Sequence, residues 1–227
     1  MRHLLFSLTG LLASHLATAQ QISRVNFDSV RVATTGPRSP LAYATLLRRF
    51  QAADTTLTPR EFTYLYYGQV YAKQYHPYGS SQPADFRTLY QQEKFQEAIP
   101  VGEKLLAASP LDISLLFNLL VCHHMLGNKA QARRYAHQYF PLVQTIMASG
   151  DGKSVETAYV VAVVHDEYAV MRELGLRVSA QALLGHTDRL TATPVGGEGK
   201  PTGGAEQLVY FDISKPFGSL GSLLKQK

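Results

Sequence analysis

Cysteine, tryptophan and long apolar runs are rare or absent in this chain of 227 residues. Its one cysteine, Cys122, cannot form an internal disulfide and lies too far along the chain to accept a lipid anchor. No apolar run approaches the roughly 20 residues of a membrane-spanning helix, so we expect no transmembrane segment. The 22 Lys and Arg and 17 Asp and Glu residues are scattered rather than clustered, which argues against a nucleic-acid partner.

Residues 1–19 have the pattern of a cleavable secretory signal peptide. Arg2 gives a positive start, an apolar stretch follows to Leu16, and Ala17-Thr18-Ala19 is the small-x-small pattern that signal peptidase accepts. We therefore expect cleavage between Ala19 and Gln20 and a mature protein that works outside the cytoplasm.

Two helices are expected in the first third of the mature chain, after an extended lead-in over residues 20–37. Ser39-Pro40 predicts the start of a helix that continues to about Ala53. Thr58 and Glu61 have the spacing of a capping box and predict a second helix toward Ala72. The prolines, glycine and serines that follow, up to Pro83, predict a loop.

An internal repeat is expected within residues 84–148, where the pattern is wholly helical. Ala98 and Ala132 align at an offset of 34 residues, the period of the tetratricopeptide repeat. The same offset places residues 92–94 on residues 126–128, at the turn between two helices. The first copy lacks the turn glycine and both lack tryptophan, so we predict a degenerate repeat.

Short strands are expected in the C-terminal third. Residues 158–164 are rich in Val and favour a strand, although one continuous helix over 155–174 is the alternative. Residues 176–182 and 189–193 alternate between polar and apolar side chains, as strands with one packed face do. Residues 206–213 are a further strand candidate.

These patterns predict an α+β fold, with N-terminal helical hairpins closed by a small C-terminal antiparallel sheet. We expect a single domain over residues 38–216, mainly sheet over 154–214, followed by a tail over 217–227. About 200 mature residues suffice for one such unit with its own core.

Five short motifs follow one another along the chain: Tyr64-Leu65-Tyr66-Tyr67-Gly68, Tyr75-x-Pro77-Tyr78, Gly150-Asp151-Gly152 with Glu156-Thr157-Ala158, Asp166-Glu167-Tyr168 and Leu208-Val209-Tyr210-Phe211-Asp212-Ile213. Their order and spacing resemble the exported bacterial family catalogued as domain of unknown function 4919 (DUF4919). The likeness covers most of residues 40–216 and implies an envelope protein of Bacteroidetes-like bacteria, periplasmic and without an established activity. The helical region is similar to tetratricopeptide proteins, which usually hold other proteins.

Candidate pocket residues are few: Asp151, His165, Asp166 and Glu167. Three adjacent side chains diverge on a helix or strand and rarely converge on one metal ion, so a structural role, with Asp166 capping a helix, is favoured. The sequence offers no nucleophile elbow or phosphate loop. We therefore predict no catalytic set, no metal and no cofactor.

Tyrosines gather over residues 64–78 and form the candidate partner-binding surface. Three of them share one helical face by spacing, and an aromatic body with a polar tip suits either helix packing or a binding surface. If exposed, this face becomes a site for a protein partner or a glycan. Its members are Tyr64, Tyr67, Tyr71, Tyr75 and Tyr78.

The leading hypothesis is a periplasmic interaction or accessory scaffold that binds an envelope protein or peptide. It depends on the repeat and on the lack of a convergent catalytic set. Two alternatives remain open: an envelope hydrolase whose site is assembled from distant residues, and a binding module for small molecules or glycans.

Overall fold

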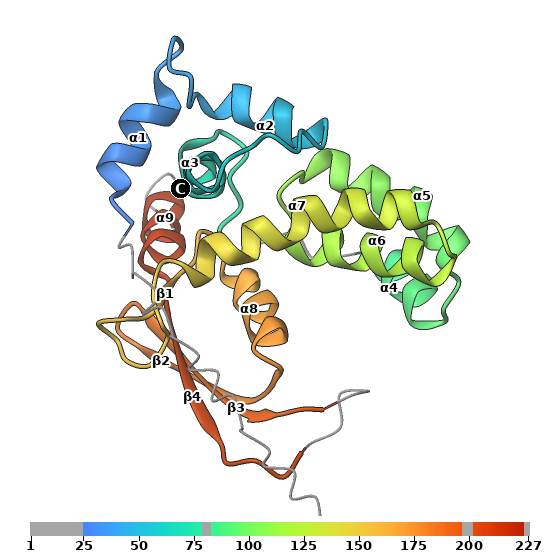
Figure 1. The fold of residues 1–227 in the computed structure, drawn as a ribbon. Coiled ribbons are helices and arrows are strands. Elements are labelled where there is room, and N and C mark those ends of the chain that lie inside the picture. The colour runs from blue at the N-terminus through green and yellow to red at the C-terminus, as the bar shows by residue number, and fades with distance from the viewer. Residues whose placement is uncertain (1–24, 79–82, 197–201, 225–227) are drawn as a thin grey trace, which may run out of the picture.

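The fold is described from a computed structural model that covers residues 25–78, 83–196 and 202–224, the last five as backbone only. The expected signal peptide lies outside the described residues. Helices come first and a small sheet comes last, which confirms the α+β class (Figure 1). The helices are α1 (Phe27–Thr35), α2 (Tyr43–Gln51), α3 (Pro59–Gly68), α4 (Ala84–Gln91), α5 (Phe95–Ala108), α6 (Ile113–Met125), α7 (Lys129–Met147), α8 (Glu167–Glu173) and α9 (Ser214–Leu224), with 3-10 turns η1 (Gln69–Tyr71) and η2 (Val164–Asp166).

Helix α1 occupies part of the expected extended lead-in, so that prediction was wrong. Asn26 caps the helix by accepting a hydrogen bond from the backbone N–H of Ser29 at 2.9 Å. Its buried residues are Val30 and Thr34, one turn apart. A single such pair is too short to show a period in the sequence.

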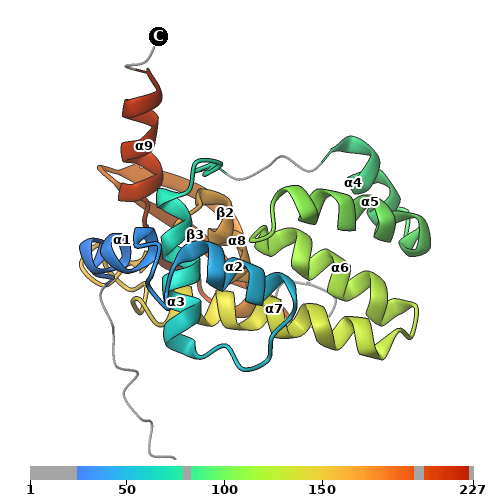
Figure 2. The same ribbon diagram turned by 90° about the horizontal axis from the view of Figure 1, so that it is seen from above.

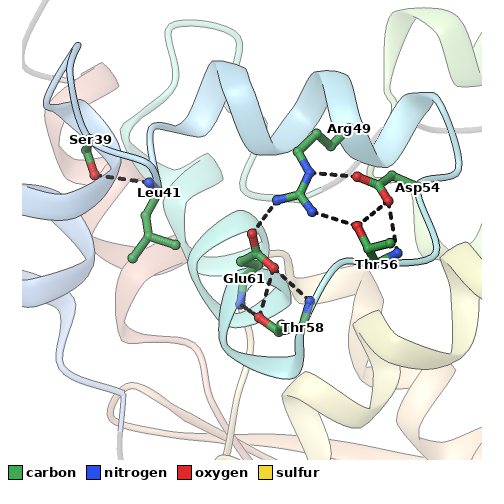
Figure 3. Close-up of polar contacts among 7 residues, drawn as sticks. All are labelled: Ser39, Leu41, Arg49, Asp54, Thr56, Thr58 and Glu61. Carbon is green, nitrogen blue, oxygen red and sulfur yellow. Dashed lines mark hydrogen bonds and ion pairs between the residues drawn. The ribbon is translucent and has the colours of Figure 1, made fainter.

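An ionic network joins α2 to the start of α3 (Figure 3). The guanidinium of Arg49 donates to Asp54 at 2.7 Å and also contacts the carboxylate of Glu61. Glu61 and Thr58 form the predicted capping box, in which each side chain bonds the other residue's backbone N–H. Hydrogen bonds to Thr56 and Arg49 lower the pKa of Asp54 to about 2, so its carboxylate stays charged.

Two helix–turn–helix units follow, α4 with α5 and α6 with α7 (Figure 2). Their helices end at Gln91 and Met125, and the next helices begin at Phe95 and Lys129, as the offset of 34 residues predicts. Glu93 in the first turn and Gly127 in the second both have a left-handed backbone, with φ of 59° and 74°.

The sheet has the order β1-β4-β3-β2 and is mixed rather than antiparallel. The short strand β1 (Tyr159–Val160) pairs in parallel with β4 (Gln207–Asp212), while β4 with β3 (Thr187–Pro194) and β3 with β2 (Leu176–Leu184) pair antiparallel. We expected a wholly antiparallel sheet, and the parallel pairing of β1 with β4 shows that this expectation was wrong. The strand β1 follows the helical layer and lies beside β4, the last strand in the chain, with both strands running in the same direction.

Residues 155–174 form a strand and then a helix, which excludes the alternative of one continuous helix. The strand is shorter than expected, two residues long, because the chain turns into η2 and α8 soon afterwards. The expected C-terminal tail is helical instead, since α9 extends from Ser214 to Leu224.

One continuous hydrophobic cluster runs from the helices into the sheet, with Leu46, Tyr66, Leu119, Val170 and Phe211 among its fully buried members. Burial of this apolar surface is the main force that holds the two layers together. Within the described ranges, no helix combines the length and apolar character needed to cross a membrane.

Candidate functional site

A cavity of about 250 Å³ lies among the helices and their connections, and none of the described residues that line it belongs to a strand. Four separate segments enclose it: α2, the stretch from η1 to residue 76, the connection from α5 to α6, and η2 with the residue before it. The α5–α6 connection turns back toward the centre of the molecule (Figure 2). The lining consists of Tyr43, Leu47, Gln51, Gln69, Ala72, Gln74, Tyr75, His76, Ala107, Ala108, Ser109, Pro110, Leu111, Asp112, Val163, His165 and Asp166.

Asp166 in the wall of this cavity is fixed by a hydroxyl from α3. The Tyr66 hydroxyl donates to Oδ2 of Asp166 at 2.7 Å and accepts the backbone N–H of Ala162 at 3.1 Å. Asp166 is only 4% exposed. Burial raises the pKa of Asp166 well above its ordinary value, although the hydrogen bond from Tyr66 opposes that shift.

Two tyrosines, Tyr43 and Tyr75, line the cavity. The hydroxyl of Tyr75 already has an acceptor within the protein, because it donates to the carbonyl of Ala162 at 2.5 Å. The backbone N–H of Val164 donates to the carbonyl of Pro77 at 2.9 Å and holds the same two segments together. Burial raises the pKa of Tyr43 to about 12, so its phenol stays neutral.

The described lining of the cavity contains carboxyl groups but no ammonium or guanidinium group. Asp112 and Asp166 supply carboxyl groups, and His76 and His165 supply imidazoles, but no lysine or arginine lines the cavity. This contrasts with the whole chain, in which Lys and Arg outnumber Asp and Glu by 22 to 17. Asp112 is also the N-cap of α6, because its Oδ1 accepts the backbone N–H of Leu115 at 2.9 Å.

The predicted tyrosine surface is divided by the fold. Tyr67 is buried, and its hydroxyl donates to the carbonyl of Val160 at 3.0 Å. Tyr71 is half-buried and donates to the carbonyl of Phe27, while Tyr64 is half-buried beneath the guanidinium of Arg60. Tyr75 lines the cavity, and Tyr78 is 48% exposed.

Two of the tyrosines line a second hollow, of about 400 Å³, between α1, α3 and the end of α7. Tyr64 and Tyr67 lie beside Arg60 there. Three of the five candidate tyrosines therefore line two separate hollows, and Tyr71 and Tyr78 line neither, so the five do not form one continuous surface.

The four candidate pocket residues are likewise separated. His165 and Asp166 line the cavity, whereas Asp151 and Glu167 do not. Asp151 lies in a turn, where its Oδ1 accepts the backbone N–H of Lys153 at 3.0 Å. Glu167 is fully buried, neither carboxyl oxygen has a hydrogen-bond partner, and burial together with Asp188 raises its pKa to about 9.

Sequence reasoning missed several lining residues, of which Tyr43, Gln69, His76 and Asp112 carry the most polar chemistry. None stands in a motif, and they come from three segments whose approach depends on tertiary packing. The N-cap position of Asp112 before an apolar helix was readable, but a cap is no sign of a pocket. Among the described residues, no group of three or more His, Cys, Asp or Glu side chains is arranged to hold a metal ion.

The fold and this cavity define an α+β protein in which helices and the segments that connect them enclose a pocket with two carboxyl groups in its lining. The family described as Domain of unknown function (DUF4919) matches residues 29–220, and the chain belongs to that family. No curated protein and no solved structure matches the chain.

Proposed function

We propose that this chain is a binding protein that holds a small polar ligand in the cavity enclosed by α2, the stretch from η1 to residue 76, the α5–α6 connection and η2. The carrying observation is that segments distant in sequence enclose a space of about 250 Å³ with both aromatic and polar side chains. That combination is typical of small-molecule sites, where apolar walls supply affinity and a few polar groups fix orientation. The volume suits a ligand of roughly the size of one sugar ring or amino acid.

A ligand screen with a blocked variant tests this function. Ala108 lines the cavity at the exposed end of α5, so Ala108→Trp fills the space without entering the core. Ala130, exposed on α7 away from the cavity, gives the control Ala130→Trp. Small polar fragments detected by ligand-observed NMR bind to the wild type and the control but not to Ala108→Trp. Equal binding to all three proteins, or no binding to the wild type, contradicts the proposal.

The interaction scaffold is a second candidate, favoured by the free edge of β2. This strand ends the sheet, most of its residues are exposed, and its nine residues include one charge, Arg177, and no proline. Such an edge accepts an added strand from an envelope protein or peptide. A crosslinked partner recovered with the wild type and with Ala130→Lys, but lost with Ala180→Lys, supports this candidate; retention by Ala180→Lys removes it.

Export to the periplasm is part of the same proposal and depends on the pattern in residues 1–19. Fractionation of the source cells with N-terminal sequencing tests it. A mature chain that begins at Gln20 in the periplasmic fraction is the expected result, and an uncleaved chain in the cytoplasmic fraction contradicts it.

A hydrolase has less support than a binding protein. His165 and Asp166 line the cavity, but Asp151 and Glu167 lie elsewhere. The ring of His165 packs against Tyr168, with 5.7 Å between ring centroids.

A further inference from the structure

Asp166 is a buried carboxyl group without a cationic partner in the described chain. Its side chain has a hydrogen bond from Tyr66, and no described lysine or arginine forms an ion pair with it. The titratable groups whose charges couple to Asp166 belong to α3, the segment after η1, the start of α6 and α8, and all of them are acidic. They are Tyr66, Tyr67, Tyr75, Asp112 and Glu167.

Such a carboxyl group is costly to ionise until a positive charge reaches it. Isolated buried charges are strongly disfavoured, and a buried acid normally stays protonated unless it is paired. Asp112 adds a second carboxyl group to the same cavity wall. The imidazoles of His76 and His165 are the basic groups of the lining, and no lysine or arginine shares it.

We propose that the cavity binds an organic ammonium group, placed between the carboxyl groups of Asp112 and Asp166 and the rings of Tyr43 and Tyr75. This inference rests on the proposed ligand-binding function and specifies the chemistry of the ligand. The ammonium group supplies the counter-charge that Asp166 lacks. The tyrosine rings add cation–π attraction, which strengthens where water is excluded.

An anionic ligand does not fit this lining. A phosphate or carboxylate group would face two carboxyl groups and find no lysine or arginine. A neutral ligand would leave Asp166 protonated and would gain no attraction to a carboxylate there. Discrimination should therefore follow ligand charge more than ligand shape.

A matched set of probes separates charge from shape. Choline carries a permanent positive charge, 3,3-dimethyl-1-butanol has carbon in place of the choline nitrogen, and 3,3-dimethylbutanoate carries the opposite charge. Ethanolamine serves as a cation with a smaller head group. By isothermal titration calorimetry, we expect at least one of the two cations to bind about tenfold or more tightly than the neutral alcohol, and the anion not to bind.

Two variants locate the effect. Asp112→Asn keeps a good N-cap on α6, so it should fold while removing one carboxyl group. Asp166→Asn removes the other, and circular dichroism checks its fold. Both should weaken binding of the cation and leave binding of the neutral alcohol unchanged.

Proton release gives a readout independent of affinity. Choline carries no titratable proton, so any proton released on binding comes from the protein. If the ammonium group stabilises ionised Asp166, choline binding releases protons, and its affinity rises with pH over the range in which Asp166 of the free protein is protonated. Titrations in two buffers of different ionisation enthalpy measure this release, and Asp166→Asn should abolish it.

The outcomes separate the two proposals. Equal affinity for choline, ethanolamine and the neutral alcohol, or preference for the anion, overturns the ammonium inference and leaves the ligand-binding function standing. Failure of all four probes, while neutral or anionic fragments still bind in the Ala108→Trp-sensitive cavity, does the same. Failure of the probes together with an empty fragment screen overturns both.

Discussion

The hydroxyl of Tyr66 and the carboxyl group of Asp166 are joined by a hydrogen bond of 2.7 Å, although the residues lie 100 positions apart in the chain. The same hydroxyl accepts the backbone N–H of Ala162, so α3 holds both ends of the segment that leads into α8. One side chain therefore links the helical layer to the wall of the cavity.

Tyr66→Phe should lower the free energy of unfolding by about 1–3 kcal/mol, because it leaves two buried polar partners unsatisfied. Urea unfolding followed by circular dichroism measures the change. Tyr64 is the matched control on the same helix, since it is half-buried and its described contact is with the Arg60 guanidinium. Tyr64→Phe should alter stability by less than about 0.5 kcal/mol. Similar losses in both variants would contradict a special role for the Tyr66 hydroxyl.

Glu167→Gln should flatten the dependence of stability on pH. Burial raises the pKa of Glu167 from 4.5 to about 9, so the folded protein binds this proton more tightly than the unfolded chain. Its contribution is therefore complete below pH 4.5 and is lost as the pH rises toward about 9. Between these values the slope of the unfolding free energy should be smaller in the variant by up to about 1.4 kcal/mol per pH unit.

Urea titrations at pH 5, 7 and 8.5 test this expectation. Glu97 is exposed on α5, and Glu97→Gln should keep the slope of the wild type. Asp166 remains in both variants, and its raised pKa acts in the same direction. An unchanged slope in Glu167→Gln would show that Glu167 is not buried as described.

Gly102→Ala should destabilise the helical layer although alanine favours helices. A Cβ atom there would lie 2.8 Å from Cε2 of Phe86 and 2.9 Å from Cδ2 of Leu119, where α4, α5 and α6 meet. Overpacking of this kind costs about 1–3 kcal/mol. Gly218 on α9 has nothing within 4 Å of the same position, so Gly218→Ala should gain about 0.5–1 kcal/mol instead. Equal signs for the two variants in thermal unfolding would contradict this packing.

Both repeat turns should be more stable with glycine at the residue that has the left-handed backbone. Glu93 has a left-handed backbone that costs a residue with a Cβ, so Glu93→Gly should stabilise the protein by about 0.5–1 kcal/mol. Gly127→Ala should destabilise it by about 1 kcal/mol through the backbone alone, since no atom lies within 4 Å of the new Cβ. Urea midpoints that move in the same direction would argue against equivalent turns.

Local signals in the sequence predicted the local structure well. Thr58 and Glu61 form their capping box because both partners lie within one helical turn. The 34-residue offset placed both hairpin turns correctly, since backbone turns depend on nearby residues. The likeness to tetratricopeptide proteins stays a prediction.

The cavity could not be predicted from such local signals in the sequence. Helical spacing placed Tyr64, Tyr67 and Tyr71 on one face, but only tertiary packing decides that Tyr67 enters the core while Tyr75 reaches the cavity. The bonds that place Tyr66 and Tyr75 span 100 and 87 residues. The parallel pairing of β1 with β4 is similarly distant, and a strand of two residues carries no period of its own.

The position of β4 between β1 and β3 sets the order in which the sheet can form during synthesis. A chain that emerges from its N-terminus delivers β1 early, yet β1 has no strand beside it until residues 207–212 follow. The backbone N–H of Val161 donates to the carbonyl of Asp212 at 3.1 Å, so this hydrogen bond also cannot form until Asp212 has been made. The segment that leads to Asp166 therefore gains its contacts with the sheet only after β4 is made. A nascent chain stopped before residue 207 should form its helices but not the complete cavity.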